Sequence, residues 1–182
     1  MAQTLLIIDI QNDYFPGGRI ELAGAMQAAE NARKVLDHFR ANKLPVIHIQ
    51  HIALQPAATF FLPGTPGAEI HPLVAPLAGE TIFQKHYPSS FRETGLLEHL
   101  KAQGITELVV VGMMTHMCVD TTVRAAFDLG FKCTVIHDAC ATLTLRFDEV
   151  SVPPQQVQAS YIAALGAVFA QPRSASEWLA AR

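Results

Sequence analysis

The sequence lacks any long apolar segment, and this absence argues against a membrane protein. No stretch of the 182 residues approaches the roughly 20 apolar residues that a membrane-spanning helix needs. The N-terminal apolar run has no basic residues before it, as a secretory signal would, and Asp9 interrupts it. We therefore expect a soluble, cytoplasmic protein that does not act at a membrane.

Charge and cysteine are also scarce. Charged residues make up 16% of the chain and its formal net charge is −3, which leaves no electrostatic case for binding nucleic acid or an anionic membrane. The three cysteines, Cys118, Cys133 and Cys140, are an odd number confined to the second half, so they do not indicate a disulfide framework. We expect them to remain thiols in a reducing compartment.

Hydrophobic residues, by contrast, are abundant. They make up 50% of the sequence, at the upper end of the range for globular proteins. The length suits one domain spanning residues 1–182, and no repeat, low-complexity tract or linker divides it. Part of the apolar excess is expected to be buried between the subunits of a homodimer or homotetramer.

Segments of strand and helix character alternate along the chain. Apolar runs predict six strands, and helical spacing predicts four helices between and after them: strands at 5–10, 46–51, 81–84, 108–111, 133–136 and 167–169, and helices at 22–39, 96–103, 118–129 and from Pro153 onward. This pattern predicts an α/β fold of three layers, α-β-α, around a six-stranded, mainly parallel sheet. Residues 53–80, rich in proline and glycine, are expected to form a long loop. The tail from about residue 171 is expected to be weakly ordered or to contact another subunit.

Three residues with chemical potential fall where predicted strands end. Asp9 closes the first apolar run, Lys85 follows the third, and Cys118 follows the fourth at the start of a helix. Each has an ordinary alternative: a capping aspartate, a solvated lysine, a small buried cysteine. Because ligands of parallel sheets bind beyond the carboxyl ends of the strands, the topology places all three at one edge. There a carboxylate and a cation could activate a thiol nucleophile.

The motifs around these residues carry a resemblance to a known family. They read DIQNDYF at 9–15, KHYPSSF at 85–91 and GMMTHMCVDTT at 112–122, in that order along the chain. Together they resemble the isochorismatase-like cysteine hydrolases, which include nicotinamidases and N-carbamoylsarcosine amidase. The similarity covers roughly residues 4 to 170.

The resemblance implies a Rossmann-like fold and a catalytic triad of Asp9, Lys85 and Cys118. It also implies a cis peptide bond between Met113 and Met114, which would direct the amides of Met114 and Cys118 at a developing oxyanion. The implied activity is hydrolysis of a small-molecule amide or related C–N bond through a thioester. Two alternatives remain open: a vinyl-ether hydrolase of isochorismatase type that does not need Cys118, and a non-catalytic ligand-binding module on the same fold.

The sequence departs from the nicotinamidase pattern at the metal site. Nicotinamidases hold a metal through an Asp-x-His pair after the second strand, whereas this chain has Gln50-His51-Ile52-Ala53. We therefore predict no metal and no cofactor, and leave the roles of His48, His51 and His71 open. Side chains near the motifs are candidate walls of a substrate pocket: Gln11, Tyr14, Phe15, Phe60, Tyr87, Phe91 and Met117.

Overall fold

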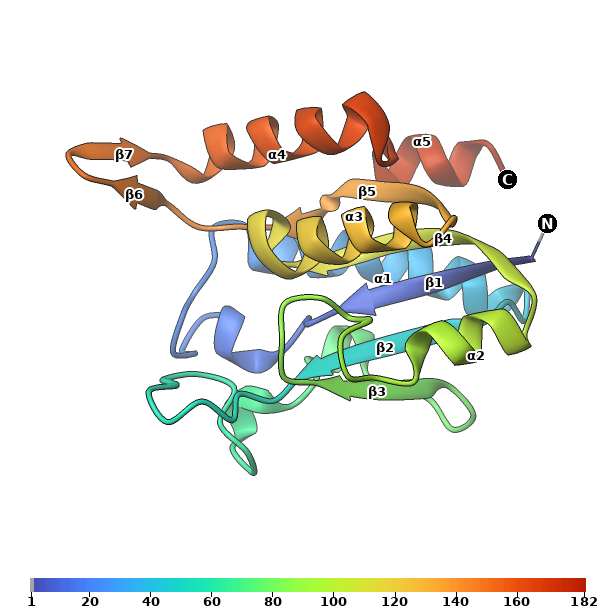
Figure 1. The fold of residues 1–182 in the computed structure, drawn as a ribbon, viewed down its shortest axis with the longest axis horizontal. Helices are drawn as coiled ribbons and strands as arrows, with labels where there is room; N and C mark the ends of the chain where they lie inside the picture. Colours follow the sequence, from blue (N-terminus) through green and yellow to red (C-terminus); the bar gives the residue numbers. More distant parts are fainter. Residues whose placement is uncertain (1) are drawn as a thin grey trace.

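Strand β1 (Ala2–Ile8) lies near the middle of a six-stranded parallel sheet and is buried on both of its faces. The computed structural model describes residues 2–182 and orders the strands β3-β2-β1-β4-β5-β8 (Figure 1). The other five strands are β2 (Val46–His51), β3 (Thr81–Lys85), β4 (Ile105–Met113), β5 (Lys132–Ala141) and β8 (Gln171–Arg173). All neighbouring pairs in this sheet are parallel, so the predicted sheet is confirmed.

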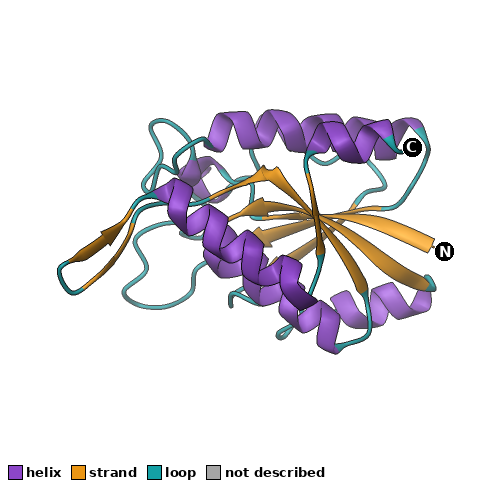
Figure 2. Ribbon diagram, turned by 90° about the horizontal axis from the view of Figure 1, so that it is seen from above, coloured by secondary structure: helices purple, strands orange, loops and turns teal. Residues whose placement is uncertain are grey.

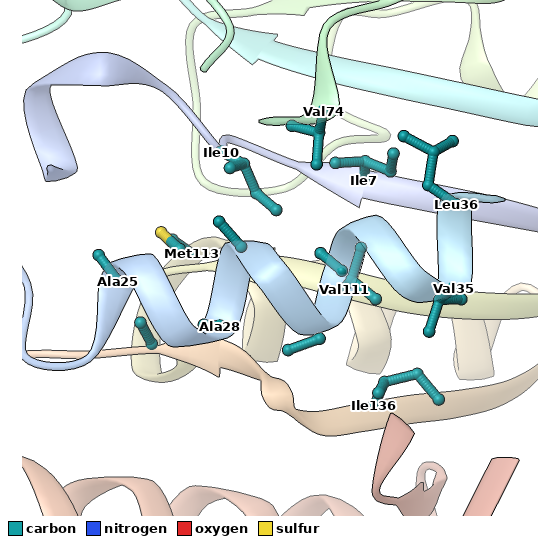
Figure 3. Close-up of a cluster of buried hydrophobic side chains, with 14 of the residues drawn as sticks. Ile7, Ile10, Ala25, Ala28, Val35, Leu36, Val74, Val111, Met113 and Ile136 are labelled. Atoms are coloured by element: carbon teal, nitrogen blue, oxygen red, sulfur yellow. The ribbon is translucent and has the colours of Figure 1, made fainter. Parts of the chain in front are cut away.

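Helices cover both faces of the sheet, as Figure 2 shows, and complete the expected three layers. Helices α1 (Ala25–Ala41) and α5 (Ala175–Ala180) contribute to one hydrophobic cluster, and α2 (Leu96–Ala102), α3 (Asp120–Asp128) and α4 (Pro154–Val168) to the other. Successive residues of β1 alternate between the two: Ile7 faces the first cluster and Ile8 the second. In Figure 3, Val35 and Leu36 of α1 lie over the sheet among the side chains of the first cluster.

None of the helices within residues 2–182 combines the length and the apolar character that crossing a membrane requires.

The sixth strand does not lie where the apolar run predicted it. Residues 167 and 168 end α4, whose last turn continues to a hydrogen bond from Phe169 N–H to the carbonyl of Leu165. The sheet's final strand is β8, which contains Pro172. Proline is tolerated there because β8 lies at the edge of the sheet and pairs only with β5. A short apolar run after a helix is compatible with either state, which is why the prediction was wrong.

The tail is well anchored, contrary to the weak order expected of it. Ser174 and Glu177 form a reciprocal capping box at the start of α5. Trp178 is buried and its ring stacks on Phe39 of α1, with centroids 5.6 Å apart. The carboxylate of Asp138 accepts a 2.7 Å hydrogen bond from Ala175 N–H, so β5 also holds this segment.

Two further features differ from expectation. Strands β6 (Leu145–Phe147) and β7 (Val150–Val152) form an antiparallel hairpin that projects beyond the carboxyl ends of the main strands (Figure 1). Phe147 on it is 78% exposed. Cys140, expected in a loop, lies within β5, whose pairing with β4 is irregular between Val110 and Gly112.

Gly112 stands where β1 and β4 approach most closely. It pairs with Ile8, and its φ of 143° is one that only glycine adopts readily. A Cβ at this position would overlap the carbonyl oxygen of Ile8. The position therefore excludes every other residue, one step before the loop that carries Cys118.

We predict that Gly112→Ala lowers the free energy of unfolding by more than about 1 kcal/mol. The strain of the positive φ and the collision of the new Cβ with β1 both contribute to this loss. Gly130→Ala is the matched control: its φ is 92°, but a Cβ added there would meet nothing within 4 Å. Chemical denaturation followed by circular dichroism measures both. Equal losses in the two variants would show that the collision with Ile8 does not matter.

Candidate active site

The structure brings Asp9, Lys85 and Cys118 together at the carboxyl edge of the sheet. Asp9 follows β1 in a left-handed conformation with φ 50°, and Lys85 is the last residue of β3. Cys118 lies in a π-helical turn, η4 (Thr115–Val119), between β4 and α3. All three side chains are buried. The sequence placed the start of the helix at Cys118, whereas α3 begins at Asp120 and the wider turn precedes it.

The ammonium group of Lys85 is the centre of this site. Its Nζ lies 2.7 Å from Asp9 Oδ2 and 3.3 Å from Cys118 Sγ. The same nitrogen lies 2.9 Å from His51 Nδ1 and 3.1 Å from the carbonyl oxygen of Tyr87. An ammonium group has three N–H donors and no acceptor, so these four neighbours share three hydrogens and none of them can donate to Lys85.

The local electrostatics favour a neutral thiol beside a charged ammonium. Burial lowers the pKa of Lys85, but the negative charge of Asp9 and the hydrogen bonds that Lys85 donates to Asp9 and Cys118 outweigh it, so the pKa is raised. Burial and then the Asp9 carboxylate raise the pKa of Cys118, against the opposing effect of Lys85. Burial and the neighbouring carboxylate therefore favour the protonated form of the cysteine.

Asp9 is placed to take the thiol proton. One of its carboxylate oxygens lies within 4.8 Å of Cys118 Sγ. Its Oδ1 is buried and has no hydrogen-bond partner in the described part of the chain, so a lone pair is unused. An unpartnered buried carboxylate oxygen is costly unless a proton comes to it during function.

His51, whose role the sequence left open, belongs to the same cluster. It is the last residue of β2 and pairs with Lys85 across the β2–β3 register. Burial and the charge of Lys85 lower the pKa of His51 to about 4. The imidazole is therefore neutral at neutral pH, and its Nδ1 lone pair is occupied by Lys85. The register of two strands, which the sequence alone does not give, creates this contact.

The loop before Cys118 is held by its side chains. The peptide bond between Met113 and Met114 is cis. Thr115 Oγ1 donates to the side-chain oxygen of Gln158 at 2.6 Å, and His116 Nδ1 lies 2.7 Å from Thr142 Oγ1. Both Thr115 and His116 are buried. The backbone around Met114 is thus fixed from β5 and from α4.

Asp9, His51 and Cys118 could by their chemistry hold a metal ion, since one ligand atom of each lies within 4.8 Å of the others. The ammonium of Lys85, however, bonds to all three and stands where a cation would lie. These residues therefore do not fit a metal while Lys85 is in place. His48 bonds to Glu80 at 2.8 Å, and His71 stacks on Phe15, so neither is directed at this cluster.

Several predicted pocket residues gather near the site. Tyr14 is buried, and burial together with the charges of Cys118 and Asp9 raises its pKa. Its ring contacts Phe61 edge to face at 4.7 Å and lies 6.1 Å from Phe60. Met117, next to Cys118 in the chain, is 42% exposed. Tyr14, Phe60 and Phe61 therefore form one aromatic cluster, and Met117 adds an exposed thioether one residue before Cys118.

Other predicted pocket residues hold the framework. Gln11 is fully buried and bonds to the backbone N–H and carbonyl of His51 and to the carbonyl of Ala68. Phe15 stacks on His71 with ring centroids 3.7 Å apart. Gln11 therefore positions the loops, and Phe15 lines a cavity together with His71 that does not include Cys118.

The last two pocket candidates lie after β3. Phe91 stacks on Phe131 and packs against the second hydrophobic cluster, and its place in a pocket stays a prediction. The guanidinium carbon of Arg92 lies 3.5 Å from the centroid of the Tyr87 ring. The backbone carbonyl of Tyr87 accepts a hydrogen bond from Lys85.

The long loop expected at 53–80 contains two short 3-10 turns, η2 (Pro66–Ala68) and η3 (Pro72–Val74), and borders the site. Its attachment comes from the first motif. Asp13, in the 3-10 turn η1 (Asn12–Tyr14), accepts a 2.6 Å hydrogen bond from Phe61 N–H. The sequence identified Asp13 only as part of a motif; its role as an anchor depends on the path of a loop that has no periodicity to predict it.

Comparison with known proteins agrees with this geometry. A family model described as "Isochorismatase domain" matches residues 3–160. The isochorismatase family protein YddQ of Bacillus subtilis (strain 168) is 48% identical over 179 residues, covering 98% of this chain and 99% of that protein. A crystal structure of an isochorismatase hydrolase from Oleispira antarctica is also 48% identical, has a TM-score of 0.94, and is matched over 98% of this chain and 96% of that one.

An amide hydrolase is among the relatives. The nicotinamidase of Acinetobacter baylyi (strain ATCC 33305 / BD413 / ADP1) is 30% identical over 177 residues, covering 79% of this chain and 83% of that protein. The resemblance carried by the three motifs is thereby confirmed at the level of the family. The chain belongs to the isochorismatase family of hydrolases.

Proposed function

We propose that this hydrolase cleaves a small-molecule amide or related C–N bond, with Cys118 as nucleophile, Asp9 as general base and acid, and Lys85 as the cation that supports both. The observation that carries the proposal is the shared contact of Lys85 Nζ with Asp9 and Cys118, at 2.7 and 3.3 Å. When a proton passes from sulfur to carboxylate, negative charge moves from one partner of Lys85 to another. The same ammonium therefore stabilises it before and after the transfer.

In the first half of the reaction, Asp9 takes the thiol proton as Cys118 Sγ bonds to the substrate carbonyl carbon. The resulting oxyanion is held by the backbone amides of Met114 and Cys118. Collapse of this intermediate breaks the C–N bond, and Asp9 gives its proton to the leaving amine. A thioester at Cys118 and a free amine are the products of this half.

In the second half, Asp9 takes a proton from water, whose oxygen attacks the thioester carbon. Collapse expels the sulfur, which regains its proton from Asp9 and releases the carboxylic acid. Each half therefore returns Asp9 to the carboxylate, and Lys85 exchanges no proton. The nicotinamidase among the relatives supports an amide as the bond cleaved.

We predict that Cys118→Ala lowers kcat/KM by on the order of 10³-fold or more, because the covalent step is removed. Ammonia or amine release from a library of small amides measures it. Cys133→Ala, which removes a buried thiol in β5 away from Lys85, serves as the control and retains activity. Undiminished turnover by Cys118→Ala, on an amide or on a vinyl ether, would exclude the cysteine mechanism.

A covalent adduct is expected during turnover of any active amide. Acid quenching followed by mass spectrometry detects an acyl group on the peptide containing Cys118. Addition of hydroxylamine, which cleaves thioesters, removes it. If rapidly quenched reactions of an active substrate never yield this adduct, direct attack by water replaces the thioester route.

Asp9→Asn is expected to have opposite effects on thiol reactivity and on catalysis. The Asp9 carboxylate raises the pKa of Cys118. Its neutralisation therefore lowers that pKa and increases alkylation by iodoacetamide at pH 8, about tenfold for each unit of pKa. Turnover is lost nonetheless, because the base is gone.

Peptide mapping of the alkylated protein measures this rate at Cys118. Cys133 and Cys140 in the same molecule serve as internal controls, since burial raises the pKa of each to about 12. Slower alkylation of Cys118 in Asp9→Asn would mean that Asp9 activates the thiol in the resting state and would contradict the assignment.

A further inference from the structure

The contact between Lys85 and His51 determines which imidazole nitrogen carries the proton. Lys85 Nζ lies 2.9 Å from His51 Nδ1, and an ammonium group can only donate. Nδ1 is therefore the acceptor and bears no hydrogen. In a neutral imidazole the hydrogen then resides on Nε2.

This tautomer excludes one role for His51 and leaves another. Its lone pair is engaged by Lys85, so it cannot take the proton of Cys118 as the histidine of a Cys–His pair does. Its Nε2–H has no partner among residues 2–182, and this nitrogen is not fully buried. A donor that is unpaired and not fully buried is available to a ligand.

The position of the ring is fixed from several sides. Gln11 bonds to the backbone N–H of His51 at 2.7 Å and to its carbonyl at 2.8 Å. Phe61 lies 5.9 Å from the ring, centroid to centroid. One ring nitrogen, the sulfur of Cys118 and a carboxylate oxygen of Asp9 all lie within 4.8 Å of one another. A donor held this firmly is preorganised to select a ligand.

We propose that His51 is a substrate-binding residue, whose Nε2–H donates a hydrogen bond to a carbonyl or carboxylate oxygen beside the carbon that Cys118 attacks. The substrates favoured would then be small amides with a second acceptor oxygen next to the scissile group. This inference rests on the proposed cysteine hydrolase function. Its test requires only that small electrophiles reach Cys118, and it does not require turnover.

Two alkylating probes test the donor without requiring a substrate. Iodoacetamide carries a carbonyl oxygen next to the carbon that sulfur attacks, and allyl iodide carries no acceptor oxygen. The ratio of their second-order rate constants at Cys118 cancels the reactivity of the thiol. We expect this ratio to fall about fivefold in His51→Phe, as loss of one neutral hydrogen bond predicts.

His51→Gln keeps an N–H donor and an acceptor oxygen, and it is expected to restore the ratio to within about twofold of the unmodified protein. His86→Phe is the matched control: His86 neighbours Lys85 in the chain, and its Nδ1 bonds to the carbonyl of Ile52 at 2.8 Å. It should leave the ratio unchanged. An unchanged ratio in His51→Phe, or an equal fall in His51→Phe and His51→Gln, would overturn the proposal.

A second measurement reads the tautomer directly. Long-range ¹H–¹⁵N NMR of the intact protein at pH 7 should show His51 protonated on Nε2 only. Lys85→Met should abolish this preference, because Nδ1 then has no donor partner. A proton on Nδ1 in the unmodified protein would refute the proposal whatever the alkylation ratios are. If the alkylation ratios and the tautomer are as expected but the unmodified protein hydrolyses no amide, the proposed function fails and this inference about His51 stands.

Discussion

The burial of one ammonium group among four acceptors sets the requirements that the rest of the site satisfies. A lysine removed from water is stable only if an anion and further acceptors compensate it. For Lys85 these come from the end of β1, the end of β2, the loop after β3 and the turn before α3. The contacts therefore join the separate ends of the sheet to one another, and the position of each reacting group depends on the others.

The ammonium group of Lys85 also explains why the raised pKa of the Cys118 thiol suits the proposed hydrolysis. A free thiolate in the resting site would add a second negative charge beside Asp9, in a region that excludes water. Keeping the proton on sulfur avoids that repulsion. In the proposed mechanism, sulfur becomes negatively charged only when Asp9 accepts its proton and is neutralised. The site therefore never holds more negative charge than Lys85 can balance.

The sequence predicted the elements whose signal is local. The apolar runs at β1, β2 and β4 predicted strands, and the parallel arrangement placed Asp9, Lys85 and Cys118 at one edge. What it missed depends on pairing. His51 meets Lys85 through the register of β2 with β3. The half-buried Phe91 packs on Phe131, which lies far from it in the sequence. The sequence predicted a strand at 167–169, where the structure has the end of α4, and it missed β8, because a short apolar run does not specify its own secondary structure.

The long loop beside the site is attached through its backbone at several points. Asp13 holds the N–H of Phe61, Gln11 holds the carbonyl of Ala68, and the carbonyl of Ile10 accepts from the N–H of His71. These anchors do not depend on which side chains the loop carries, although Glu80 and His71 are also held by their side chains, through Arg40 and Phe15. Positions between the anchors can therefore carry different residues while the path of the loop stays constant. Substrate selectivity can change there without any change to the residues that meet at Lys85.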